Sequence, residues 1–172
     1  MKHFILLFTF FVFLGTAQAQ IGNNQIGIGL DLGIPVGDLG RSTRIAPGAS
    51  LKALYGVGMS GQVGITLGYL HFAARNNTLI KSSSTEIPIL ASYRQHVDQI
   101  YLEPQIGVSL MQSKIEGEQM PPMEVSQTNF SWGIGLGYHL QGIDLSLRYQ
   151  SASRNGGSRG FIGLRAGYNF NL

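Results

Sequence analysis

The stretch that decides the fold is residues 130–139, Phe-Ser-Trp-Gly-Ile-Gly-Leu-Gly-Tyr-His. Its large apolar side chains stand at the even positions, and small or polar residues stand at the odd ones. A period of two is typical of a β-strand with one apolar face. Three interior glycines also argue against a helix, because each costs about 1 kcal/mol there relative to Ala. The stretch therefore predicts a β-strand with one apolar face and one face of small or polar residues.

The same alternation recurs along the chain and predicts seven more strands. They cover residues 26–34, 50–57, 62–69, 86–94, 100–110, 143–150 and 162–172. The 172 residues include 24 Gly, and only 12% are charged while 44% are hydrophobic. Low charge with this hydrophobicity excludes a disordered chain. The absence of Cys excludes disulfides, thiol catalysis and Cys-ligated metals.

The connections between these strands alternate in length. Long polar segments are expected after every odd-numbered strand, at residues 35–47, 73–84, 111–126 and 151–159. Tight turns are expected after the even-numbered strands, at residues 58–61, 95–98 and 140–142. The Gly-x-Gly-x-x-Gly pattern at 56–61 falls on such a turn between strands, so we do not interpret it as a nucleotide-binding loop. Long loops on one rim and short turns on the other are typical of outer-membrane barrels.

Charge distinguishes the two faces of the strands. All charged residues of the predicted strands share the face opposite the apolar one, and they comprise Asp31, Lys52, Glu86, Arg94, Glu103, Asp144, Arg148 and Arg165. A basic side chain on the apolar face would cost about 2–4 kcal/mol at the bilayer midplane. We therefore expect the apolar face to contact lipid and the charged face to line the lumen. Four acids and four bases can pair there and neutralise one another.

Aromatic residues and the chain start support a membrane location. Outward aromatics are expected in two interfacial belts, one near each rim. They comprise Tyr69, Phe130, Trp132 and Tyr149 at the long-loop rim, and Tyr55, Tyr93, Tyr138, Tyr168 and Phe170 at the other. Residues 1–19 combine a short basic start, an apolar run and Ala17-Gln18-Ala19, which predicts a cleaved signal peptide. Residues 20–172 are then the barrel domain.

Two C-terminal stretches carry a family resemblance. They are residues 144–150, Asp-Leu-Ser-Leu-Arg-Tyr-Gln, and residues 160–170, Gly-Phe-Ile-Gly-Leu-Arg-Ala-Gly-Tyr-Asn-Phe. With the pattern above, the chain resembles the small OmpA-like and OmpX-like barrels and their Bacteroidetes-type relatives. The resemblance implies an all-β fold, an eight-stranded antiparallel up-and-down transmembrane β-barrel with short periplasmic turns and longer extracellular loops. It also implies a monomer in the bacterial outer membrane.

The C-terminus resembles the signal that the barrel-assembly machinery of this family reads. The pattern is Tyr168-x-Phe170-x-Leu172, which departs from the family in ending on Leu where an aromatic residue is usual. The resemblance implies the barrel-assembly machinery as a partner. We expect no periplasmic peptidoglycan-binding domain after the last strand.

The sequence offers few residues that could form a catalytic site. Lipid A deacylases of this barrel class place a His two residues before a Ser, whereas Ser151 has no such His. The predicted mature chain has only His71, His96 and His139, of which we expect His96 in a turn and His139 hydrogen-bonded to Asp144 in the lumen. We therefore expect a non-enzymatic barrel without metal or cofactor, with a lipid A-modifying enzyme as the alternative.

The remaining alternatives are a plugged structural or surface-interaction barrel and a narrow pore. Long lumen side chains favour the plug. Loops one, two and four have six basic residues against one acid, comprising Arg41, Arg44, Arg75, Lys81, Arg154 and Arg159 against Asp38. Loop three has Lys114 against Glu116, Glu118 and Glu124. A basic rim suits lipopolysaccharide phosphates, and Arg154 and Arg159 beside two glycines are a candidate phosphate site or a solvated loop. A formal charge of +3 does not indicate nucleic-acid binding.

Overall fold

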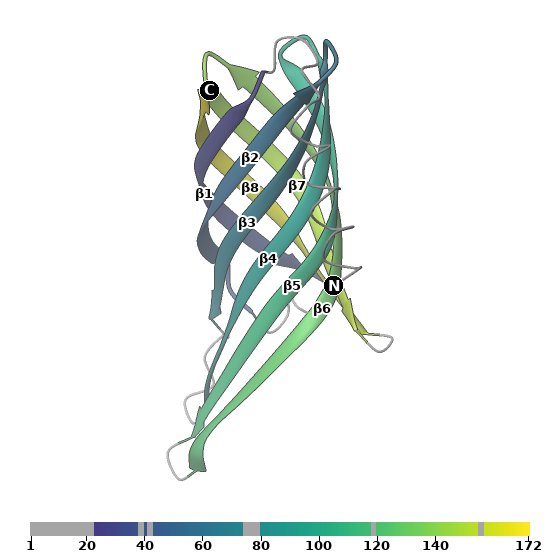
Figure 1. Cartoon of the computed structure of the whole chain (residues 1–172). Helices are drawn as coiled ribbons and strands as arrows, with labels where there is room; N and C mark the ends of the chain where they lie inside the picture. The colour runs from purple at the N-terminus through teal and green to yellow at the C-terminus, as the bar shows by residue number, and fades with distance from the viewer. Residues whose placement is uncertain (1–22, 38–39, 41–42, 74–79, 118–119, 155–156) are drawn as a thin grey trace, which may run out of the picture.

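The computed structural model is a closed barrel of eight antiparallel strands, each hydrogen-bonded to its neighbours in chain order (Figure 1). The structure describes residues 23–37, 40, 43–73, 80–117, 120–154 and 157–172. The predicted signal peptide lies outside these residues. The strands are β1 Gln25–Val36, β2 Ala46–Val57, β3 Gly61–Ala73, β4 Ile80–Val97, β5 Ile100–Gly117, β6 Met120–Leu140, β7 Ile143–Arg154 and β8 Gly157–Asn171. This confirms the predicted fold class and strand number.

The barrel closes by pairing its last strand with its first. The β1–β8 register runs from the Gln25–Asn171 pair to the Val36–Gly160 pair, with an extra backbone hydrogen bond from the N–H of Leu172 to the carbonyl oxygen of Asn24 at 2.9 Å. Closure leaves no unpaired edge along the body of the barrel, which is what a spanning sheet requires in hydrocarbon. Among the described residues, no helix is long and apolar enough to cross a bilayer.

The two faces of the strands separate as the alternation predicts. Along β1 from Gln25 to Ile34, odd-numbered residues are buried and even-numbered ones are exposed, with Leu30 at 74% and Asp31 at 3%. The register keeps this phase from strand to strand, because Asp31 pairs with Arg165 on β8 and with Gly48 on β2. Large apolar side chains therefore cover the outer surface, and polar side chains fill most of the lumen, together with a few buried apolar ones such as Leu54 and Leu90.

The tight turns join strands at the end of the barrel where the C-terminus lies (Figure 1). They are shorter than predicted, because the strands run to Val57, Val97 and Leu140 and leave residues 58–60, 98–99 and 141–142. Gln141 and Gly142 have φ of 50° and 91°. Positive φ at both central positions matches a type I′ turn, whose twist suits a hairpin. The Gly-x-Gly-x-x-Gly pattern is confirmed as a turn.

Two of the four segments expected as long loops, residues 111–126 and 151–159, are mostly strand, which corrects the prediction there. β5 and β6 continue to Gly117 and Met120, so only residues 118–119 join them, and β7 and β8 leave only 155–156. The β5–β6 hairpin projects beyond the rest of the barrel (Figure 1). The ladder Lys114–Glu124 and Ser113–Val125 continues there. Backbone hydrogen bonds hold these residues in a sheet although their side chains no longer alternate between lipid and lumen.

Candidate functional site: the lumen and its mouth

The structure places all eight predicted lumen charges inside the barrel. Their relative exposures do not exceed 4%. They come from six of the eight strands and comprise Asp31 of β1, Lys52 of β2, Glu86 and Arg94 of β4, Glu103 of β5, Asp144 and Arg148 of β7, and Arg165 of β8. We call this set the lumen network. A buried charge is tolerable only when it is paired and hydrogen-bonded, so its partners decide what the interior can do.

Arg94 is the centre of the lumen network. Its Nε donates to Glu103 Oε2 at 2.6 Å, and its Nη1 lies 2.9 Å from Asp144 Oδ2. The guanidinium also stacks 3.7 Å from the ring centroid of Tyr101, whose hydroxyl donates to Asp144 Oδ1 at 2.6 Å. Since Arg94 belongs to β4 and Asp144 to β7, this arrangement crosses the interior from one wall to another.

Two further ion pairs lie beside Arg94: one crosses the interior from β2 to β5, and the other joins the adjacent strands β7 and β8. Lys52 of β2 donates to Glu103 of β5 at 2.7 Å, and Arg165 Nη1 lies 3.2 Å from Asp144 Oδ1. Each of the two central carboxylates therefore meets two cations. Such a shared arrangement satisfies more of the carboxylate lone pairs than a single pair would.

A separate ion pair lies between β7 and β1. Arg148 Nη2 is 3.3 Å from Asp31 Oδ1, and Asp31 Oδ2 accepts a hydrogen bond from Ser50 at 2.6 Å. Ser50 in turn accepts from Arg165 Nε at 3.0 Å. This hydroxyl links the Arg148–Asp31 pair to the cations around Asp144.

Glu86 differs from the other carboxylates in having no ion pair among the described residues. Its Oε1 accepts hydrogen bonds from Ser109 at 2.8 Å and from Gln150 at 3.1 Å. Ser109 also shares a 2.6 Å hydrogen bond with Ser131. The Gln150 contact reaches from β7 to β4, so a layer of hydrogen bonds without an ion pair crosses the lumen between the ion pairs and the long-loop end.

Glycines in the lumen make room for these long side chains. A Cβ on Gly137 would overlap the ring of Tyr101. A Cβ on Gly29 would lie 2.7 Å from Arg165 Nε, and one on Gly167 would lie 2.9 Å from its Cζ. The guanidinium of Arg165 therefore lies in space that only glycine leaves free.

An apolar cluster lies in the lumen toward the long-loop end, and the sequence reasoning missed it. Ala46, Leu70, Phe72 and Phe161 are each at most 3% exposed, and the two Phe rings lie 5.8 Å apart edge to face. We call this set the mouth cluster. These residues fell in or next to segments predicted as loops. Strand parity could have found them, because Leu70 and Phe72 continue the inward series of β3 that contains Thr66.

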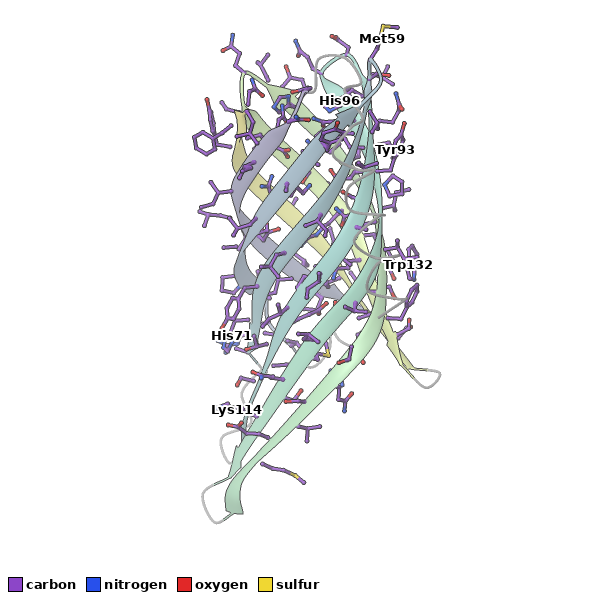
Figure 2. The ribbon with its side chains drawn as sticks, viewed as in Figure 1. Met59, His71, Tyr93, His96, Lys114 and Trp132 are labelled. Atoms are coloured by element: carbon purple, nitrogen blue, oxygen red, sulfur yellow. The ribbon has the colours of Figure 1, made fainter. Side chains whose placement is uncertain are left out.

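The aromatic belts are confirmed as outward-facing. Figure 2 shows Tyr93 toward the short-turn end and Trp132 farther along the barrel toward the long-loop end, both on its outside. Trp132 contacts Tyr149 at 5.7 Å between centroids, and Tyr168 contacts Phe170 at 4.8 Å. All nine predicted belt residues are between 38% and 53% exposed, which suits side chains that anchor the barrel at the two interfaces.

The three histidines that the structure describes do not form a common centre. His71 lies toward the long-loop end, whereas His96 lies at the short-turn end (Figure 2), at the end of β4 and not in the turn itself. His96 and His139 face one another at 6.1 Å between ring centroids. His139 pairs with Asp144 in the register, yet its Nε2 has no hydrogen-bond partner among the described residues. The expected His139–Asp144 hydrogen bond is wrong, because other donors occupy the carboxylate.

The basic rim is only partly within the described residues. Arg44 and Arg159 are exposed at the long-loop end. The side chain of Lys114 forms an exposed ion pair with Glu124 across the β5–β6 hairpin. The remaining predicted rim charges have side chains outside the described part of the chain, and they comprise Asp38, Arg41, Arg75, Lys81, Glu116, Glu118 and Arg154. No group of three or more His, Asp or Glu suited to a metal ion occurs within the described ranges.

The chain belongs to the outer membrane protein beta-barrel domain family, whose model matches residues 4–170. It is therefore an integral protein of the outer membrane. Comparison with curated proteins gave no match.

Solved structures share the fold at low sequence identity. Ail, the attachment invasion locus protein of Yersinia pestis, aligns with a TM-score of 0.67 and 18% identity over 87% of this chain and 99% of its own. OprG of Pseudomonas aeruginosa aligns with a TM-score of 0.59 and 11% identity over 88% of this chain and 97% of its own. Neisserial surface protein A aligns with a TM-score of 0.57 and 14% identity over 87% of this chain and 97% of its own. These likenesses establish the fold, and function has to be argued from the site.

Proposed function

We propose that the protein is a non-conducting barrel that acts through contacts of its extracellular face, without catalysis. The observation that carries the proposal is the set of ion pairs that cross the lumen. Arg94 joins β4 to β5 and β7, and Lys52 joins β2 to β5. An eight-stranded barrel is just wide enough for side chains to fill its interior. Pairs that reach from wall to wall therefore leave no continuous column of water.

Two layers support the plug along the barrel axis. The ion pairs occupy the first, and the hydrogen bonds of Glu86 with Ser109 and Gln150 occupy the second together with the mouth cluster, because the register pairs Leu70 with Glu86 and Phe161 with Gln150. An ion entering from outside would have to displace apolar side chains and break hydrogen bonds among buried groups. Each of these steps is costly in a low-dielectric interior.

The contact role is supported by the projection of β5 and β6 and by exposed basic residues. The projecting hairpin places polypeptide outside the membrane region (Figure 1), and Arg44 and Arg159 are exposed at the same end. Guanidinium groups bind phosphate and sulfate through charge-assisted hydrogen bonds, so phosphates of the surrounding lipopolysaccharide are suitable partners. The structure of Ail in complex with the heparin analogue sucrose octasulfate is consistent with an anionic partner for a barrel of this fold.

Export and assembly complete the proposal. Residues 1–19 act as a cleaved signal peptide, and the mature protein is a monomer. Tyr168, Phe170 and Leu172 act as the signal for the barrel-assembly machinery. Their side chains point outward at 45%, 53% and 76% exposure beside the β1–β8 seam, where a partner can reach them before closure.

Recordings in planar bilayers test the plug. Wild-type protein should show no steady conductance, whereas Arg148→Ala should raise leak because it leaves Asp31 without its ion pair. Lys114→Ala is the matched control, since it removes a cation from the exposed hairpin and should remain silent. Large, steady, ion-selective steps from the wild type would replace the plug with a pore.

Immobilised lipopolysaccharide tests the contact role. The double reversal Arg44→Glu and Arg159→Glu should weaken salt-sensitive retention of the barrel, because exposed charge pairs are screened by salt. Lys114→Glu, on the acidic hairpin, is the control and should change retention little. Equal retention of all three proteins would contradict the proposed polyanion contact.

A further inference from the structure

A cavity of about 440 Å³ opens at the long-loop end of the lumen, between the parts of β5, β6, β7 and β8 nearest that end. Its lining comprises Met111, Gln127, Asn129, Ala152, Gly157, Ser158 and Arg159. We call it the mouth cavity. Its volume lies within the 300–1,000 Å³ that is usual for small-molecule sites. The cross-strand pairs Met111–Gln127 and Ala152–Arg159 form its walls.

Asn129 is a buried polar residue in this lining, and only part of its hydrogen-bonding capacity is used. The side chain is 6% exposed, and its Nδ2 donates only to the Met111 sulfur at 3.3 Å. Its Oδ1 has no hydrogen-bond partner within the described part of the chain. Thioether sulfur is a weak acceptor, and an unsatisfied buried amide in a native protein requires an explanation. A ligand in the mouth cavity that offers hydroxyl groups would supply the missing partners.

Arg159 gives the mouth cavity a positive charge. Its Nη1 lies 3.6 Å from the same Met111 sulfur, so the guanidinium leans over the cavity. It forms no ion pair with any described carboxylate. The nearest lumen acid in the register is Glu86, the cross-strand partner of Met111, and its Oε1 accepts from Ser109 and Gln150 instead. None of the described residues that line the mouth cavity is acidic.

We infer that the mouth cavity is a binding site for a phosphorylated sugar unit. Arg159 binds the phosphate, and the amides of Asn129 and Gln127 bind the sugar hydroxyls. Met111 and Ala152 provide an apolar floor for the face of the sugar ring. This goes beyond the proposed function, which assigns no small-molecule site, and it requires only that the mouth faces the cell exterior.

The geometry also selects the direction of entry. Most of the lining residues occupy inward positions of their strands, so the mouth cavity opens along the barrel axis and not toward the bilayer. Its ligand therefore arrives from the extracellular side, either as a free sugar phosphate or as a phosphorylated sugar of a polysaccharide chain. A membrane lipid beside the barrel could not reach it.

Nuclear magnetic resonance titration of the ¹⁵N-labelled barrel in nanodiscs tests this inference, with glucose 6-phosphate as the probe. Backbone amide signals of Met111, Asn129, Ala152 and Arg159 should shift and saturate at millimolar probe. Glucose and inorganic phosphate are the fragment arms, and each should bind at least tenfold more weakly than the intact probe. Absence of saturable shifts would overturn the inference. Equal affinity for inorganic phosphate would reduce the site to an unspecific anion contact and overturn it as well.

Matched variants locate the binding energy. Arg159→Gln should weaken glucose 6-phosphate binding tenfold or more, whereas Arg44→Gln removes an exposed rim charge outside the cavity lining and should not change it. Asn129→Leu should abolish the preference for glucose 6-phosphate over inorganic phosphate, with the heat-modifiable gel shift confirming the fold. If Arg44→Gln weakens binding as much as Arg159→Gln does, general rim charge explains the result and the site is refuted. These binding measurements do not involve conductance, so their outcome does not depend on whether the lumen is plugged.

Discussion

Replacing Arg94 by Leu should destabilise the barrel by about 3–5 kcal/mol, the usual cost of breaking a buried ion pair. Arg94 is fully buried and contacts two carboxylates at 2.6 and 2.9 Å as well as the ring of Tyr101. Its loss leaves Glu103 with Lys52 and Asp144 with Arg165, so each carboxylate keeps one cation. The remaining lumen charge becomes negative by one, and a cavity opens beside Tyr101.

A double-mutant cycle isolates the electrostatic part of this cost. Glu103→Gln alone should also destabilise, because Arg94 and Lys52 then lose a shared acceptor. The double variant should be more stable than the sum of the two single effects implies, by about 1–3 kcal/mol, as is usual for contacting residues. Lys114→Leu is the exposed control and should cost about 0–1 kcal/mol.

Urea unfolding from phospholipid vesicles measures these changes. Trp132 is the only tryptophan and is outward-facing, so its fluorescence reports transfer from lipid to water. Full additivity of the Arg94 and Glu103 effects, or a cost for Arg94→Leu no larger than for Lys114→Leu, would refute the paired lumen network.

Three further variants test facing, packing and closure. Leu136→Arg should lower the free energy of unfolding by about 2–4 kcal/mol in the same assay, since it places a charge in lipid. If Leu136→Arg destabilises the barrel less than Leu136→Ser does, the assignment of the lipid-facing and lumen-facing sides is wrong. Gly107→Ala should prevent tight β4–β5 pairing, because its Cβ would overlap the backbone oxygen of Ile89, whereas Gly135→Ala has its nearest contact at 3.5 Å and should unfold at nearly the wild-type urea concentration. Deletion of residues 168–172 should abolish the heat-modifiable band on gels because β8 can no longer close against β1, and a wild-type band would contradict closure.

The alternation predicted which residues face the lumen because a strand has only two faces and one of them must contact lipid. A shift of one residue would move every charge into hydrocarbon, so the phase is strongly determined. This reasoning placed Asp31, Arg94 and Glu103 inside the barrel, and the structure buries all three. The fold could therefore be predicted mainly because one face of every strand must contact lipid.

Outside the membrane this constraint does not apply, and there the alternation no longer predicted the structure. The distal parts of β5 and β6 are strands because their backbones pair, although their side chains no longer need to alternate. The hydrogen bond expected between His139 and Asp144 followed correctly from the register but ignored competition, since Arg94, Tyr101 and Arg165 already contact the carboxylate. The mouth cavity likewise depends on side-chain conformations that periodicity does not specify.

Cysteine accessibility tests most directly whether water runs through the lumen. The chain has no Cys, so a single introduced thiol reports its own surroundings. Ser131 is fully buried in the lumen, hydrogen-bonded to Ser109 beside Glu86, and Ser126 is exposed farther out on the same strand. With a membrane-impermeant maleimide and folded protein in vesicles, Ser126→Cys should label rapidly, whereas Ser131→Cys should label only after unfolding in urea. Labelling of folded Ser131→Cys as fast as Ser126→Cys would show an open water path and contradict the plugged barrel.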